Sequence, residues 1–97
     1  MVNISDLLEK NNIQLDIPDK WGTLNIDDED LAEYKYSTES IDGKTIHVFS
    51  KPSIERNGDE GKDEIIIDLE DGLISFINAD GVLTQFDKEL NITDETV

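Results

Sequence analysis

The chain has 97 residues, with 24 acidic side chains against 8 basic ones, a formal net charge of −16 at pH 7 and no cysteine. This length fits one small domain, the missing cysteines exclude a disulfide framework and a thiolate metal site, and the charge disfavours binding to nucleic acid or to an anionic membrane. No apolar run approaches the ~18 residues of a membrane span, and no basic segment precedes one, so we expect a cytoplasmic protein without a signal peptide.

The first predicted element is a short helix that begins after Asn3. Asn3 is a favourable N-cap residue, and Asp6 lies at the third helical position. A pair of asparagines at 11–12 marks the expected end of this helix. Its apolar positions fall on one face: Ile4, Leu7 and Leu8.

An acidic segment follows between residues 27 and 33. Acidic residues favour the N-terminus of a helix, so the segment could form one or two helical turns, but it could equally be a loop. It lies shortly after the only tryptophan, Trp21. The acidic residues of this segment are Asp27, Asp28, Glu29, Asp30 and Glu33.

From residue 34 the pattern changes to short strands. Three Asp-Gly pairs, at 42–43, 71–72 and 80–81, each favour a hairpin, and Pro52 should end a strand because it has no N–H to donate. We therefore predict an α+β fold, a five-stranded antiparallel β-meander with the short N-terminal helix packed on one face. The expected strands span residues 34–41, 44–51, 64–70, 73–78 and 82–87.

The lengths of the turns decide which side chains share a face of the sheet. We predict a two-residue loop at 71–72 and three-residue loops at 41–43 and 79–81, with Gly81 in a left-handed conformation. The expected core face carries Tyr34, Tyr36, Ile46, Val48, Ile65, Ile67, Leu69, Ile74, Phe76, Val82 and Phe86. The opposite face should be acidic around an apolar strip, and it carries Glu39, His47, Phe49, Glu64, Ile66, Asp68, Glu70, Ile77, Leu83 and Asp87.

The domain boundaries follow from this pattern. Residues 1–87 form a single acidic α+β domain. Residues 88–97 are polar, and we expect a frayed C-terminal tail.

The sequence offers little for catalysis or for metal binding. His47 is the only histidine and has no cysteine or strand-to-helix serine motif beside it, so we expect no enzyme activity. Neither the acidic run at 27–30 nor the loop at 57–61 has the ligand and glycine spacing of a calcium loop. We therefore expect no cofactor and no dedicated metal site.

The first ten residues, Met-Val-Asn-Ile-Ser-Asp-Leu-Leu-Glu-Lys, resemble the start of phage uracil-DNA glycosylase inhibitors. Some small acidic anti-CRISPR proteins open with a similar helix. Both families are small acidic α+β proteins whose carboxylates take the place of DNA phosphates, so the resemblance implies an inhibitor. Residues 16–21 depart from the glycosylase-inhibitor pattern that carries its contacts, so no functional residue is carried over.

We predict an acidic inhibitor that binds a cationic nucleic-acid-binding enzyme or nuclease as a DNA or RNA mimic, of the phage anti-defence type. Alternate side chains of a strand project about 6.6 Å apart, which is the order of spacing of successive phosphates. The alternatives are an immunity protein or antitoxin that neutralises a basic toxin, a calcium-binding acidic domain, and a structural component whose charge only aids solubility. The predicted partner-binding residues are Asp27, Asp28, Glu29, Asp30, Glu33, Glu64, Asp68, Glu70, Ile66, Ile77 and Trp21.

Overall fold

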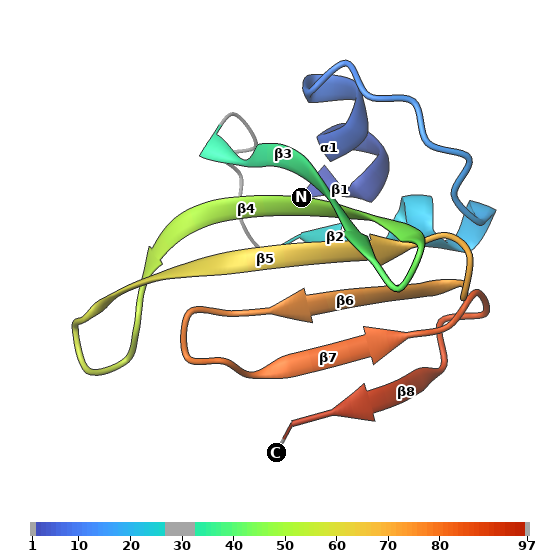
Figure 1. The fold of residues 1–97 in the computed structure, drawn as a ribbon. Helices are drawn as coiled ribbons and strands as arrows, with labels where there is room; N and C mark the ends of the chain where they lie inside the picture. The colour runs from blue at the N-terminus through green and yellow to red at the C-terminus, as the bar shows by residue number, and fades with distance from the viewer. Residues whose placement is uncertain (1, 27–32, 97) are drawn as a thin grey trace.

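The computed structural model describes residues 2–26 and 33–96 and shows one short α-helix with a six-stranded antiparallel sheet (Figure 1). The sheet runs in chain order from β3 at one edge to β8 at the other, and β1 and β2 form a separate pair. The α+β class and the antiparallel meander are confirmed, but the sheet has six strands instead of five. The elements are β1 (Val2–Asn3), α1 (Ile4–Lys10), the 3-10 helix η1 (Asp19–Thr23), β2 (Asn25–Ile26), β3 (Lys35–Ile41), β4 (Lys44–Ile54), β5 (Glu60–Asp68), β6 (Leu73–Ile77), β7 (Leu83–Phe86) and β8 (Ile92–Glu95).

Helix α1 begins and ends where the sequence predicts. The Asn3 side chain accepts a hydrogen bond from the Asp6 N–H at 3.0 Å, and the Asp6 carboxylate accepts one from the Asn3 N–H at 3.0 Å, which together form a capping box. Asn11 is the C-cap, and Asn12 follows with a positive φ of 56°. A helix of seven residues depends on packing for its stability, and its three predicted apolar residues are all buried. Within the described parts of the chain, no helix has the length and apolar character needed to cross a membrane.

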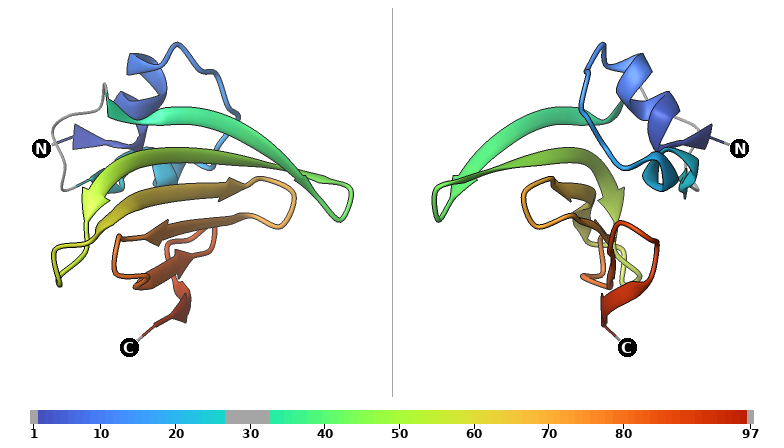
Figure 2. Two further views of the ribbon diagram at one scale, coloured as in Figure 1. Left: turned by 60° about the vertical axis from the view of Figure 1, so that its left-hand side comes forward. Right: turned by 90° about the vertical axis from the view of Figure 1, so that its right-hand side faces the viewer.

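The core lies between the sheet and a layer formed by α1, η1 and the β1–β2 pair, all on the same side of the sheet (Figure 2). Trp21 is fully buried in this layer, and its indole Nε1 donates to the Asp87 carbonyl at 2.9 Å. The prediction of Trp21 as a partner-binding residue is therefore wrong, because the ring fills the core and is not accessible to a partner. The buried residues of the core are Ile4, Leu7, Leu8, Trp21, Ile26, Tyr34, Phe49, Ile65, Ile67 and Ile74.

The β3–β4 hairpin is tighter than expected. Ile41 pairs with Lys44, so only Asp42 and Gly43 form the loop, with φ of 52° and 81°. Positive φ at both central residues is the mark of a type I′ turn, whose twist matches that of the strands. The predicted three-residue loop at 41–43 is therefore wrong.

This one-residue difference moves every side chain of β4 to the other face of the sheet. His47 pairs with Ile67, and Phe49 pairs with Ile65, so both lie on the side of α1, and Phe49 is fully buried. The prediction had placed His47 and Phe49 away from the core. Ile46 and Val48, predicted in the core, instead lie on the opposite face.

Strand β4 also continues past Pro52, which pairs with Lys62 of β5. The pairing of β3 with β4 stops at Lys35 and Ser50, so among the described strands Pro52 has a partner only in β5. A missing N–H is tolerated at such an edge position. The prediction that Pro52 ends the strand is wrong for this reason.

The β5–β6 loop is longer than predicted but keeps the expected faces. Asp68 pairs with Leu73, which leaves residues 69–72 as a four-residue loop. Adding two residues preserves parity, so Ile67 and Ile74 still lie together on the core side. Leu69 lies in the loop instead of a strand and packs against the core.

The β6–β7 loop confirms its prediction. The Asn78 N–H donates to the Val82 carbonyl at 3.1 Å, which leaves residues 79–81 as the loop, and Gly81 has a φ of 81°. Thr84 and Phe86 therefore point to the core side, opposite Phe76 and Ile74. Val82 shares that side but is 42% exposed.

The predicted frayed tail contains a strand. Asp87 accepts hydrogen bonds from the N–H groups of Glu89 and Asn91, both at 2.9 Å, and Leu90 has a φ of 66°. This compact turn reverses the chain, so that β8 pairs with β7. The bond from the Asn91 N–H is the main reason why the pKa of Asp87 lies below its ordinary value. The Asp87 side chain therefore serves the turn and does not extend the acidic face of the sheet.

Candidate protein-binding surface

The face of the six-stranded sheet opposite α1, hereafter the open face, carries a continuous set of apolar side chains. Direct cross-strand pairs join Val48 to Ile66 and Ile77 to Leu83, and Ile46 and Leu73 lie in the adjoining row. Directly paired residues share a face and place their side chains about 5 Å apart. The apolar side chains of the open face are Ile46, Val48, Ile66, Leu73, Ile77 and Leu83.

None of the described helices or strands packs on the open face (Figures 1 and 2). The sheet is strongly curved, and the end of the β3–β4 hairpin bends toward this face. Ile46 and Val48 are buried at 6% and 5% exposure, whereas Ile66, Ile77 and Leu83 are half-buried. An apolar strip therefore stays accessible along β5, β6 and β7.

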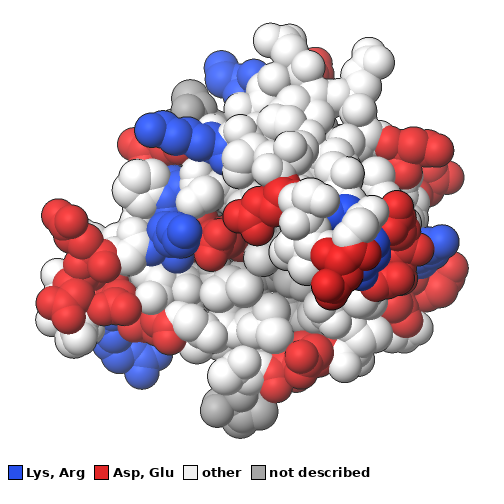
Figure 3. Space-filling view, in the orientation of Figure 1, with Lys and Arg blue, Asp and Glu red and all other residues white. Residues whose placement is uncertain are grey.

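Carboxylates accompany this strip. The pairing of the strands places Glu39, Glu64, Asp68 and Asp94 on the open face. Figure 3, which looks onto this face, shows acidic side chains at its two ends and others nearer its middle, with basic side chains among them. The predicted apolar strip is therefore present with carboxylates beside it. The same pairing also places Lys35, Lys44 and Lys62 on this face, so it is less acidic than predicted.

Glu64, Ile66 and Ile77 lie together on the open face as predicted. Glu64 pairs directly with Ile77 across β5 and β6, and Ile66 lies two residues from Glu64 on β5. The Glu64 carboxylate is 3.8 Å from the Lys62 ammonium, and its side chain is 24% exposed. Such a loose surface pair contributes little, so Glu64 remains able to interact with another cation.

The carboxylate of Asp68 makes its contacts within the protein. It is 9% exposed, its carboxylate lies 3.0 Å from the Lys44 ammonium, and it accepts the Asp71 N–H at 3.0 Å. Burial is the largest influence and would raise the pKa of Asp68, but the bonds from Asp71 and Lys44 lower it below its ordinary value. Lys44 also binds the Asp71 carboxylate, and that bond is the main cause of its raised pKa. Asp68 thus closes the β5–β6 loop and anchors the β3–β4 hairpin, and it cannot serve as an exposed phosphate mimic.

The other predicted site residues are not brought together with the open face. Glu70 is exposed but lies in the β5–β6 loop. Glu33 is exposed and lies just before β3 in the chain. The remaining acidic predictions, Asp27, Asp28, Glu29 and Asp30, lie outside the described residues.

Three members of the open face were not predicted to lie there: Ile46, Val48 and Leu73. A signal for the first two was present, because an Asp-Gly pair prefers the two-residue type I′ turn. With that turn, the alternation of β4 puts Ile46 and Val48 on one face and Phe49 on the other. For Leu73 the signal was absent, because a four-residue loop has no distinctive sequence.

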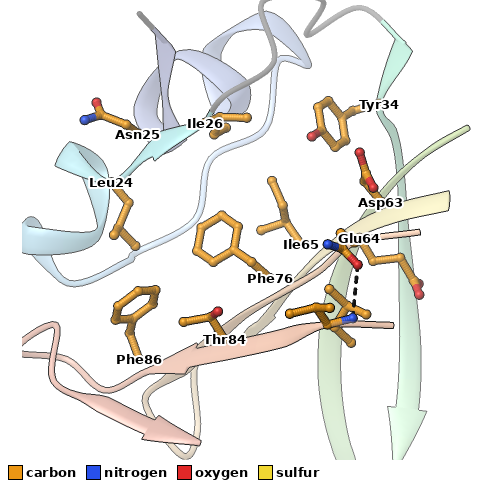
Figure 4. A pocket seen from close by; sticks show the side chains of 13 residues that line it. Leu24, Asn25, Ile26, Tyr34, Asp63, Glu64, Ile65, Phe76, Thr84 and Phe86 are labelled. Carbon is orange, nitrogen blue, oxygen red and sulfur yellow. Dashed lines mark hydrogen bonds between the residues drawn. The ribbon is translucent and has the colours of Figure 1, made fainter. Parts of the chain in front are cut away.

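A second feature is a pocket on the core side of the sheet, hereafter the inner pocket. It has a volume of about 420 Å³ and lies between β2 and the strands β5, β6 and β7 (Figure 4). Its walls are mainly apolar, and its polar groups include the Tyr34 hydroxyl and the Asp63 carboxylate. Its lining includes Leu24, Tyr34, Asp63, Ile65, Phe76 and Phe86.

The described residues contain no group of three or more His, Cys, Asp or Glu side chains placed to hold a metal ion. The His47 ring lies against Tyr36, with Nδ1 at 2.7 Å from the Tyr36 hydroxyl and the two ring centres 5.9 Å apart. This contact bridges β3 and β4 and gives His47 a structural role at the edge of the sheet.

Comparisons with protein-family models, with curated proteins and with solved structures gave no match. The open face and the inner pocket are therefore the features on which a function can be argued.

Proposed function

We propose that this chain is an acidic inhibitor that binds a cationic nucleic-acid-binding enzyme through the open face. The observation that carries the proposal is the accessible apolar strip of Ile66, Ile77 and Leu83 beside carboxylates, in a chain of net charge −16. An uncovered apolar strip beside acidic groups suits a partner with an apolar patch surrounded by basic residues.

The two kinds of side chain have different roles in such a complex. Exposed carboxylates attract a cationic surface over distances of about 10 Å and raise the association rate. Apolar side chains that become fully buried hold the complex and set the dissociation rate. Completing the burial of a half-exposed isoleucine contributes on the order of 1 kcal/mol, so several of them are needed.

The partner is expected to use its nucleic-acid groove, because that is where such an enzyme concentrates positive charge. Nucleic acid and this chain should then compete. An immunity protein that binds away from the groove would not be displaced by duplex DNA, and this separates the two alternatives.

The test uses the full chain immobilised on beads and incubated with a bacterial lysate at about 50 mM salt, with elution at about 500 mM, a range that strongly screens exposed charges. Retained proteins are identified by mass spectrometry and retested as purified proteins. We expect a basic nucleic-acid-binding enzyme that is inhibited by the chain and displaced by duplex DNA.

Two pairs of variants connect the captured protein to the open face. Ile77→Ser should speed dissociation, whereas Ile92→Ser, an exposed apolar residue at 55% exposure outside this face, should not. Glu39→Lys with Asp94→Lys should slow association more than the equal charge change Glu9→Lys with Asp16→Lys on the side of α1. Binding that ignores Ile77 and is unchanged by salt would contradict the proposal.

A further inference from the structure

The inner pocket has an aromatic and aliphatic floor. Phe76 of β6 and Phe86 of β7 meet edge to face, with ring centres 6.1 Å apart and planes at 80°. Ile65 of β5 and Leu24 add to the apolar lining, as Figure 4 shows. The volume of about 420 Å³ lies within the ~300–1,000 Å³ that ligand pockets span.

One end of the pocket is polar. Tyr34 is 6% exposed, and its hydroxyl, which points toward the pocket interior in Figure 4, has no hydrogen-bond partner among the described residues. Asp63 lies beside it, and one of its carboxylate oxygens accepts the Ala79 N–H at 2.9 Å. The second oxygen has no partner among the described residues. Burial, followed by the nearby charge of Asp63, raises the pKa of the Tyr34 hydroxyl.

No buried side-chain N or O atom of the described residues lacks a hydrogen-bond partner, so the Tyr34 hydroxyl and the second Asp63 oxygen remain in contact with solvent. A ligand that fills the pocket displaces this water and must bond to both groups to offset its loss. A neutral apolar ligand would leave both groups unpaired, and an anion would be repelled by Asp63. The complementary ligand has an apolar stem that lies on the Phe76 and Phe86 rings and a cationic head that donates several hydrogen bonds.

We propose that the inner pocket binds an arginine side chain presented by a protein partner. The guanidinium can donate to the Asp63 carboxylate and to the Tyr34 oxygen at the same time, because its donors form a planar fork. It is also more weakly hydrated than an ammonium group and stacks on aromatic rings, which favours arginine over lysine here. Most of the inner pocket's lining lies on the core side of the sheet, although Glu64 and Ile77 of the open face also line it. This inference goes beyond the proposed function and does not depend on it.

The test is an NMR titration of the ¹⁵N-labelled full chain with N-acetyl-arginine amide. The neutral, nearly isosteric N-acetyl-citrulline amide serves as the control ligand. We expect saturable shifts of the Ala79 and Thr84 amide signals with the arginine probe, at a dissociation constant on the order of 1 mM for so small a ligand. Equal shifts with both probes, or none with arginine, would overturn the proposal without any variant.

Variants then test whether Asp63 and Tyr34 bind the guanidinium at the polar end of the pocket. Asp63→Asn keeps an oxygen for the Ala79 N–H but removes the charge, and we expect binding to weaken by roughly tenfold, the usual effect of losing a charge-assisted bond. Tyr34→Phe should weaken it several-fold. Asp16→Asn removes one equal charge at an exposed position away from the pocket and should leave the shifts unchanged. If Asp16→Asn weakens binding as much as Asp63→Asn, the probe responds only to the net charge, and the pocket site is refuted.

Discussion

Gly81 allows a backbone conformation to be tested without interference from packing. Its φ is 81°, and a Cβ atom built there would have nothing within 4 Å. A substitution therefore acts through the backbone alone. Valine, which is β-branched, should lower the free energy of unfolding by roughly 1–2 kcal/mol, whereas asparagine, which tolerates the left-handed region, should cost clearly less.

For a domain of this size, 1–2 kcal/mol corresponds to a fall of roughly 5–15 °C in the melting temperature. Circular dichroism against temperature and against urea measures both variants, with unchanged urea slopes as the check that the same surface unfolds. Gly81→Val should melt well below Gly81→Asn. If the two variants are equally stable, the left-handed residue is not what fixes the three-residue loop, and the register argument for β7 fails.

Three further predictions concern the core and the β5–β6 loop. Phe49→Ala should cost about 3–5 kcal/mol, measured by urea unfolding, because the ring is fully buried; a change under about 0.5 kcal/mol, as for a surface residue, would return Phe49 to the outer face. Trp21→Phe should cost roughly 0.5–1.5 kcal/mol, read by circular dichroism, because the Asp87 carbonyl loses its indole donor while keeping the Leu90 N–H; an unchanged midpoint would show that this bond contributes nothing. The pKa of Asp68 is lowered from 3.8 in the folded protein, so its stabilising effect is present above that pH and disappears as the pH falls through the folded pKa. The stability difference between wild type and Asp68→Asn should therefore be constant near neutral pH and shrink below about pH 4, and a difference that grows in acid would reverse the assigned sign.

The elements with local causes could be predicted from sequence. Helix α1 follows from Asn3, Asp6 and three apolar residues at helical spacing, which interact within ten residues of each other. The β6–β7 loop followed from matching faces across a short turn. In both cases the interactions that decide the structure lie between near neighbours in the chain.

The face of β4 could not be decided by the same reasoning. The apolar residues Ile46, Val48 and Phe49 give both faces of this strand an apolar character, so alternation alone left the register to the turn. A three-residue loop between β3 and β4 would place Ile46 and Val48 in the core. The type I′ turn at Asp42 and Gly43 instead determines the register of β3 and β4. The fully buried Phe49 ring then replaces them beneath α1.

The formation of strand β8 and the pairing of the Asp68 carboxylate depend on contacts that the sequence pattern does not show. The C-terminal strand requires the turn that the Asp87 side chain stabilises. The residues after Asp87 are mostly polar, and this composition alone is typical of a frayed tail. Asp68 looked like any acidic residue on an outer face, but Lys44, 24 positions away, neutralises it. Which carboxylates of a highly acidic chain are available to a partner is thus a question of long-range pairing.

The net charge of the chain offsets a risk that the exposed apolar strip creates. An open sheet face bearing Ile66, Ile77 and Leu83 invites association with another apolar face, including that of a second copy. A net charge of −16 opposes that self-association, because two copies repel each other, while the same charge attracts a basic partner. Repulsion disfavours a second copy of the chain, and attraction favours a basic partner. The apolar strip can then remain uncovered until a cationic surface binds. A charge that only aids solubility would leave the uncovered strip unexplained, and for this reason we propose one binding function for the two features.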